Sequence, residues 1–103
     1  MIKVRISTRA SAFIRAERAY LKRFNKRAAA GISRQFREVQ NILSDYPNVG
    51  THVAARGDVR RFVTPPYIVE YEIHSTELVI LMIRHGRQLP LDLDDGEDVG
   101  DAD

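Results

Sequence analysis

Residues 59–87 read VRRFVTPPYIVEYEIHSTELVILMIRHGR and predict a β-hairpin that is basic at both ends. The first long run alternates at period two, which places four side chains on one face of a strand: Tyr67, Val69, Tyr71 and Ile73. The next run is apolar throughout, from residue 78 to residue 83. Because a strand that is apolar on both faces must be covered on at least one of them, we expect this run in the middle of a sheet.

Basic side chains gather where these predicted strands begin and end. Residues 59–63 form a further predicted strand, which stops at Pro65-Pro66. Successive strand residues point to opposite faces, so at most one of Arg60 and Arg61 shares a face with a given ligand. The pattern predicts a positive patch on a rigid support, with five candidate target-binding residues: Arg60, Arg61, Arg84, His85 and Arg87.

The first half of the chain predicts one strand and two helices. Residues 2–6 alternate as a strand, and Ser7 or Thr8 can cap the helix that follows. That helix runs to about Phe24, and the expected inward residues are Ala10, Phe13, Ile14, Tyr20, Leu21 and Phe24. After a break at Asn25, a second helix ends at Pro47 and has its apolar stripe at Ala29, Ile32, Phe36, Val39, Leu43 and Tyr46.

The break at Asn25 is so short a connection that the two helices must be antiparallel. They form a hairpin that lays one apolar side on the sheet. Four arginines are expected to form a solvated helical surface: Arg15, Arg18, Arg34 and Arg37. Residues 48–58 are expected to form a loop, and Ser75-Thr76 to turn one strand of the hairpin into the next.

Length and composition predict a small domain without disulfides. The 103 residues have room for one hydrophobic core, and there is no cysteine. The N-terminus lacks the apolar stretch of a signal peptide, and no apolar run approaches the roughly 20 residues of a membrane span. We therefore expect a cytoplasmic protein with no membrane association.

The formal net charge of +2 conceals a segregation of charge. Residues 1–88 hold all 16 Lys and Arg and seven of the 14 acids, a net charge of +9, whereas residues 89–103 hold the other seven acids, −7. Few large apolar residues follow residue 88, so this acidic tail is expected to be flexible. The basic body, residues 1–88, predicts an acidic partner, either nucleic acid or an acidic protein segment.

Three pieces of the chain, in this order, resemble the RelE/ParE superfamily of toxin–antitoxin toxins, most closely its ParE-like branch. They are a helical hairpin closing on Tyr46-Pro47-Asn48-Val49-Gly50, the strands around Val59-Arg60-Arg61 and residues 66–71, and the run from Ile80 to Arg87. The resemblance implies an α/β (α+β) fold of β-α-α-β-β-β order, with the helical hairpin on a mainly antiparallel sheet. It also implies the toxin of a type II pair, which poisons DNA gyrase by binding.

A second interpretation, also drawn from the resemblance, is a RelE-like, ribosome-dependent and metal-free mRNA endonuclease, with His85 and the arginines around the phosphate. Those nucleases are similar in having an arginine after the first tyrosine of the third strand and an aromatic or acid–base residue soon after the last strand. Here Ile68 and Gln88 stand in those regions. A third interpretation is an antitoxin-binding module without toxic activity.

No metal site or cofactor is expected, because the sequence has no phosphate-binding glycine-rich loop and no histidine pair at helical spacing. The expected partner is a cognate antitoxin in a hetero-oligomer, bound at Phe13, Tyr20, Phe36, Val39, Arg15 and Arg37. The plainer interpretation of His85 is a solvated residue at a strand end. Tyr67 and Tyr71 are interpreted as core aromatics whose hydroxyls contact water.

Overall fold

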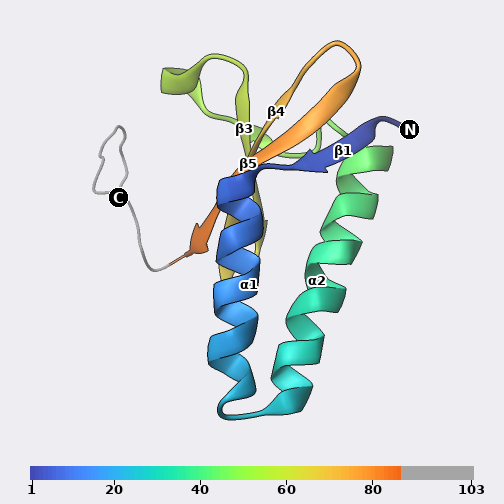
Figure 1. Cartoon of the computed structure of the whole chain (residues 1–103). Helices are drawn as coiled ribbons and strands as arrows, with labels where there is room; N and C mark the ends of the chain where they lie inside the picture. Colours follow the sequence, from blue (N-terminus) through green and yellow to red (C-terminus); the bar gives the residue numbers. More distant parts are fainter. Residues whose placement is uncertain (87–103) are drawn as a thin grey trace.

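The computed structural model describes residues 1–86, which form a helical hairpin packed on one face of a sheet (Figure 1). The elements are β1 (Lys3–Ile6), α1 (Thr8–Lys22), α2 (Lys26–Asp45), β2 (Thr51–His52), the 3₁₀ helix η1 (Ala54–Arg56), β3 (Val59–Thr64), β4 (Tyr67–Ile73) and β5 (Glu77–His85). Arg87 and the acidic tail, residues 89–103, lie outside the described residues.

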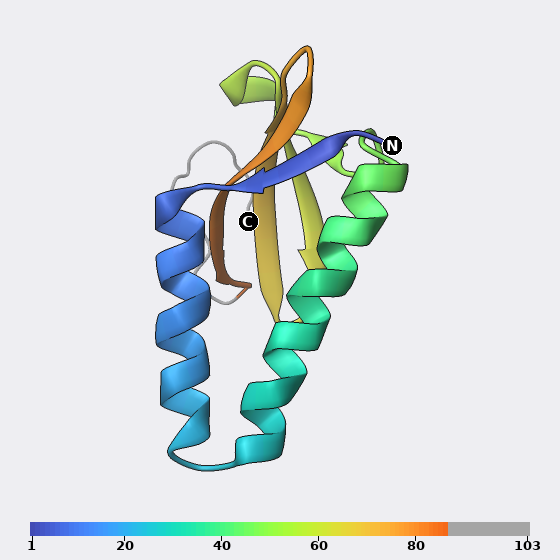
Figure 2. The ribbon, with the colours of Figure 1, turned by 45° about the vertical axis from the view of Figure 1, so that its right-hand side comes forward.

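The five strands form one sheet in the order β1-β5-β4-β3-β2. β1 pairs with β5 in parallel, and the other neighbouring strands are antiparallel. The predicted α+β fold is therefore confirmed, and so is the place of the fully apolar run, because β5 lies between β1 and β4. Figure 2 shows both helices on the same side of this sheet.

The prediction of a plain loop over residues 48–58 is wrong in part, because this segment contains β2 and η1. Thr51 and His52 pair with Arg61 and Arg60 and extend the sheet at its β3 edge. A strand of two residues is too short to show an alternating pattern, so its sequence carries no periodic signal.

Side-chain caps set where the two helices begin. Ser7 Oγ accepts a hydrogen bond from the Ala10 amide at 3.0 Å, and Asn25 Oδ1 accepts from the Arg27 amide at 2.8 Å. Each bond satisfies an amide that has no partner inside the helix. Ser7 also donates to the Leu81 carbonyl at 2.9 Å, where a bulge interrupts the pairing of β4 with β5. One serine thus joins the start of α1 to the middle of β5.

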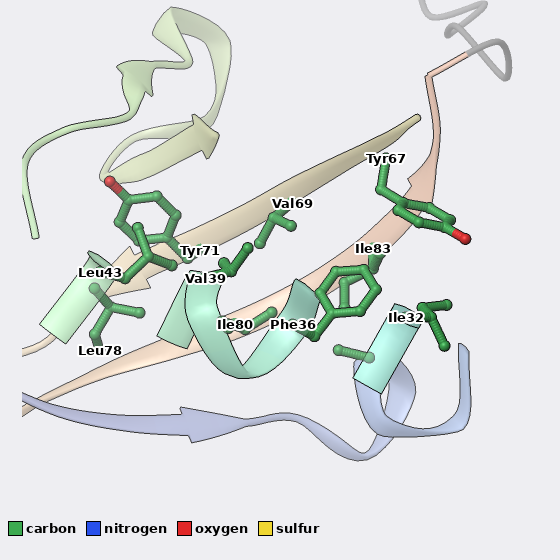
Figure 3. Close-up of a cluster of buried hydrophobic side chains, with 11 residues drawn as sticks. Ile32, Phe36, Val39, Leu43, Tyr67, Val69, Tyr71, Leu78, Ile80 and Ile83 are labelled. Atoms are coloured by element: carbon green, nitrogen blue, oxygen red, sulfur yellow. The ribbon is translucent and has the colours of Figure 1, made fainter. Parts of the chain in front are cut away.

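The core lies between α2 and the helix-facing side of the sheet (Figure 3). As predicted, the stripe of α2 is buried at Ala29, Ile32, Phe36, Val39 and Leu43. The sheet contributes alternate residues of β4 and three residues of β5: Leu78, Ile80 and Ile83. The last two are three residues apart instead of two, because the bulge adds one residue to β5 between them. The close-up shows Phe36 and Val39 directed into this cluster from α2.

Three residues predicted to face inward are instead exposed: Tyr20 at 55%, Phe24 at 69% and Tyr46 at 67%. Tyr20 and Phe24 lie near the turn between the helices, which projects past the ends of the strands in both views (Figures 1 and 2). Tyr46 follows the last helical residue and has a φ of −134°, so the helical spacing no longer sets its direction.

The loop after α2 is fastened to the sheet through Tyr71. Its buried hydroxyl accepts a hydrogen bond from the Gly50 amide at 2.9 Å and donates one to the Pro47 carbonyl at 2.7 Å. A Cβ atom added at Gly50 would stand 2.8 Å from the Arg61 carbonyl oxygen and 2.8 Å from the Tyr71 hydroxyl. Glycine is thus required here by close approach of the chain. The expectation of a water-exposed hydroxyl at Tyr71 was wrong.

We predict that Tyr71→Phe lowers the free energy of unfolding by about 1–3 kcal/mol, because it leaves the Gly50 amide and the Pro47 carbonyl without their partner. Gly50→Ala should cost about the same by forcing backbone apart. The matched control is Tyr46→Phe, whose exposed hydroxyl should matter by less than about 0.5 kcal/mol. Denaturant unfolding measures all three, and equal values for Tyr71→Phe and Tyr46→Phe would contradict this account.

Candidate functional site

A buried glutamate gathers three arginines on the sheet face opposite the helices. Glu70 is 2% exposed and lies in β4 between Val69 and Tyr71, which face the helical core. Because successive side chains of a strand point to opposite faces, Glu70 points away from the helices. Its carboxylate accepts hydrogen bonds from Arg56 at 2.6 Å and Arg61 at 3.1 Å, and lies 3.5 Å from Arg84. We call Glu70 and these three residues the arginine cluster.

The arginine cluster joins three separate elements. Arg56 comes from η1, Arg61 from β3 and Arg84 from β5. The Arg56 and Arg61 side chains remain 45% and 39% exposed, whereas Arg84 is 15% exposed. The Glu70 carboxylate thus fixes the positions of the three guanidinium groups. Arginine stays charged at any physiological pH, and its planar fork suits carboxylate or phosphate oxygens.

The arginine cluster is not saturated by its own contacts. The Arg61 Nε atom is buried and has no hydrogen-bond partner in the described part of the chain. Buried donors are normally paired, because an unpaired one loses its bonds to water without replacement. A bound partner cannot reach this buried atom, but the Arg56 and Arg61 side chains are 45% and 39% exposed, and their accessible N–H groups suit acceptor oxygens of an anion.

The structure brings together only part of the predicted target-binding set. Arg61 and Arg84 share the outer face. Arg60 points to the other face, where it donates to the Gly50 carbonyl at 2.8 Å. The Arg84 side chain is only 15% exposed and lies beside Glu70.

Sequence reasoning missed Arg56 and Glu70. An acid inside a strand flanked by buried apolar residues was the available signal for Glu70. Arg56 left no such signal, because it belongs to a segment without periodicity and meets Glu70 only in the folded chain.

A second polar cluster lies on the helix side, at the end of β5. The Tyr67 hydroxyl donates to Glu17 of α1 at 2.8 Å, and His85 Nε2 lies 3.3 Å from the same carboxylate. The ring centroids of Tyr67 and His85 are 5.3 Å apart, and those of Phe13 and His85 are 5.6 Å apart in an edge-on arrangement. The His85 side chain therefore packs on the helix side of the sheet, against α1. His85 lies at the strand end with its side chain 36% exposed, so it is partly solvated as expected, whereas the Tyr67 hydroxyl is bonded to Glu17 and not to water as expected.

Burial raises the pKa of the Tyr67 phenol well above its usual value near 10, and the Glu17 carboxylate raises it further. Below pH 10 both folded and unfolded Tyr67 hold the proton, so the contribution to stability is complete. Above about pH 10 the unfolded tyrosine loses its proton while the folded one keeps it, and stability falls as pH rises. The stabilising contribution of this phenol is therefore confined to the lower pH range.

We predict a shallower loss of stability in Tyr67→Phe than in the unaltered protein as pH rises above about 10. Some loss should remain, because burial raises the pKa of Tyr71 as well. Denaturant unfolding at a series of alkaline pH values measures both slopes. Identical slopes for the two proteins would show that Tyr67 does not keep its proton in the fold.

The residues predicted to bind an antitoxin divide between surface and core. Arg15 and Arg37 are exposed, Tyr20 is exposed and Phe13 is half-buried. Phe36 and Val39 are 3% and 2% exposed, so they are core residues and are not available to a partner on the surface of this fold. The remaining four still define a surface on the helical hairpin.

Residues 1–86 contain neither a cluster of metal ligands nor a membrane-spanning helix. This part of the chain contains no group of three or more His, Asp or Glu side chains arranged to hold a metal ion. None of its helices is both long and apolar enough to cross a membrane.

Comparison with known proteins places the chain in a family. The family model described as "ParE toxin of type II toxin-antitoxin system, parDE" matches residues 4–90. The chain therefore belongs to the ParE toxin family of type II toxin–antitoxin systems. The match spans β1 to β5, and so includes both the arginine cluster and the helical hairpin.

A solved structure supports the same fold. The structure described as "Chromosomal ParDE TA system from P. aeruginosa" is similar with a TM-score of 0.70 and 18% sequence identity, over 82% of this chain and 96% of that one. No curated protein sequence matches the chain. Family membership rests on the family model, and the structural likeness confirms the arrangement of helices and strands.

Proposed function

We propose that this ParE-family toxin inhibits DNA gyrase by binding to it, and that a cognate antitoxin neutralises it in a toxin–antitoxin hetero-oligomer. Family membership supports the toxin role. The observation that carries the mode of action is the arginine cluster, where Glu70 holds Arg56 and Arg61 on the face that the helices leave open. Preorganised cations on a rigid sheet favour binding, because little side-chain freedom is lost when a partner arrives.

The same geometry argues against the nuclease alternative. Cleavage of RNA needs a base and an acid beside the cations that bind the phosphate. His85 is the histidine considered for that role, but it packs against Phe13 and Tyr67 on the helix side, whereas Arg61 and Arg84 lie on the outer face. One phosphate cannot contact both sides of a sheet, so His85 and the arginine cluster do not form one catalytic site.

For the antitoxin, we propose the exposed side of the helical hairpin, around Phe13, Tyr20, Arg15 and Arg37. The cations would attract an acidic segment, and the aromatic side chains would give it apolar contact. This surface and the arginine cluster lie on opposite sides of the molecule. An antitoxin that reaches only the helices would leave the arginine cluster open, so neutralisation requires either a segment long enough to wrap around or steric exclusion of gyrase.

The gyrase proposal predicts that Arg56→Gln raises the toxin concentration needed for half-inhibition of supercoiling by roughly tenfold. Arg56 has the most exposed side chain of the cluster, and glutamine keeps an N–H donor for Glu70; denaturant unfolding checks that the variant is folded. The matched control is Arg9→Gln, an exposed arginine of α1, which should change inhibition less than twofold. Purified gyrase, relaxed plasmid and the full-length toxin suffice for the assay.

Two outcomes would contradict the proposal. One is a folded, unaltered toxin that leaves supercoiling unchanged at high concentration. The other is rapid cleavage of transcripts on ribosomes in expressing cells, abolished by His85→Ala, which would establish the nuclease alternative.

A further inference from the structure

The chain around the turn between α1 and α2 holds more basic residues than any other stretch of the described chain without an acid. Between Glu17 and Glu38 there are seven bases and no acid: Arg18, Lys22, Arg23, Lys26, Arg27, Arg34 and Arg37. All seven are exposed. Both views show the turn between the helices projecting beyond the strands (Figures 1 and 2), so the four bases between residues 22 and 27 lie on a protrusion.

These charges are not balanced within the fold. Among residues 1–86, the ion pairs involve other basic residues, and none of the seven takes part in one. Arg18 donates to the Ser33 hydroxyl at 3.1 Å, which joins the two helices without neutralising the charge. A surface that serves only solubility mixes both signs of charge, because like charges repel. A stretch of one sign indicates an anionic ligand.

Two exposed aromatic rings lie in the middle of this charge. Tyr20 and Phe24 are one helical turn apart, with ring centroids 5.1 Å apart and planes inclined at 62°. The guanidinium of Arg23 stands 5.9 Å from the centre of the Phe24 ring. We name Tyr20, Lys22, Arg23, Phe24 and Arg27 the hairpin tip. Phe24 is the most exposed aromatic side chain of the described residues, and contact with water is unfavourable for a ring of this size.

We propose that the hairpin tip binds single-stranded nucleic acid. Cations that track a phosphate backbone, interleaved with aromatic faces on which unpaired bases stack, are the two elements from which sequence-independent single-strand sites are built. An acidic protein segment would pair with the cations, but it could cover the rings only where it carries aromatic or apolar side chains at the right spacing, whereas every unpaired base presents a flat face. A duplex would satisfy the cations through its phosphates while keeping its bases stacked on one another, away from Tyr20 and Phe24.

This inference does not rest on gyrase inhibition, because the hairpin tip and the arginine cluster are separate surfaces of the molecule. The two proposals are compatible, because gyrase acts on DNA. A toxin bound to gyrase through its sheet would have its helical hairpin free to contact a single strand of that DNA. If the toxin did not inhibit gyrase, the hairpin tip could still bind nucleic acid. If the hairpin tip bound no nucleic acid, the gyrase proposal would be unaffected.

The test is fluorescence anisotropy with the full-length protein and labelled oligonucleotides of about 20 nucleotides, longer than the roughly 4–16 that one compact site covers. Single-stranded DNA, single-stranded RNA and a DNA duplex of the same sequence form the three arms. The double reversal Arg23→Glu with Arg27→Glu should weaken single-strand binding by roughly tenfold or more and flatten its dependence on salt. Phe24→Ala should weaken single-strand binding by about tenfold and duplex binding much less.

The matched control is Lys3→Glu with Arg9→Glu, which makes the same change in net charge at exposed positions away from the hairpin tip. It should change affinity less than about threefold, and circular dichroism should show that every variant is folded. Equal weakening by the two double reversals would mean that net charge alone is responsible and would overturn the proposal. An unchanged affinity in Phe24→Ala would overturn it as well, as would capture of an acidic peptide at the tip by a protein that binds no oligonucleotide.

Discussion

Glu70 puts a carboxylate where the sheet would otherwise be apolar, and the outer face of the protein is organised around that group. A buried charge is stable only with partners, so the burial of Glu70 requires guanidinium groups from the surrounding elements. Arg61 reaches it from the next strand, Arg84 from the other neighbouring strand, and Arg56 from η1. The contact of Arg56 explains why a short, otherwise irregular segment between β2 and β3 has a defined position over the sheet.

The sheet separates two kinds of chemistry. On the helix side, Tyr67, Glu17 and His85 join α1 to β5, and Tyr71 fastens the loop around Gly50, so polar groups there serve the fold. On the outer side, the same strands present cations that remain partly exposed. A substitution on the helix side is therefore expected to act through stability, and one at Arg56 through binding. The alternation of side chains along β4 produces this division, because each face receives every second residue.

The parts of the fold that depend on local spacing could be predicted from sequence. The stripe of α2 from Ala29 to Leu43 and the central place of β5 are of this kind. The bulge at Leu81 could not be predicted, because an unbroken apolar run has no alternation that shows which residues face the helices. The exposure of Tyr20 and Phe24 depends on how far the helices extend past the sheet, which helical periodicity does not report. At the site, the arginines were predicted as a group, but their division between faces and the link from Arg56 to Glu70 depend on contacts between distant residues.

The central claim is that the Glu70 carboxylate holds the outer arginines in place, and a double-mutant cycle tests it most directly. Unfolding free energies are measured for Glu70→Gln, Arg61→Gln and the double variant, beside the same cycle for the exposed pair Arg5 and Glu77. The account predicts a coupling of about 1 kcal/mol or more for Glu70 with Arg61, and less than about 0.5 kcal/mol for the exposed pair. Additive effects at Glu70 and Arg61, within about 0.3 kcal/mol, would contradict it.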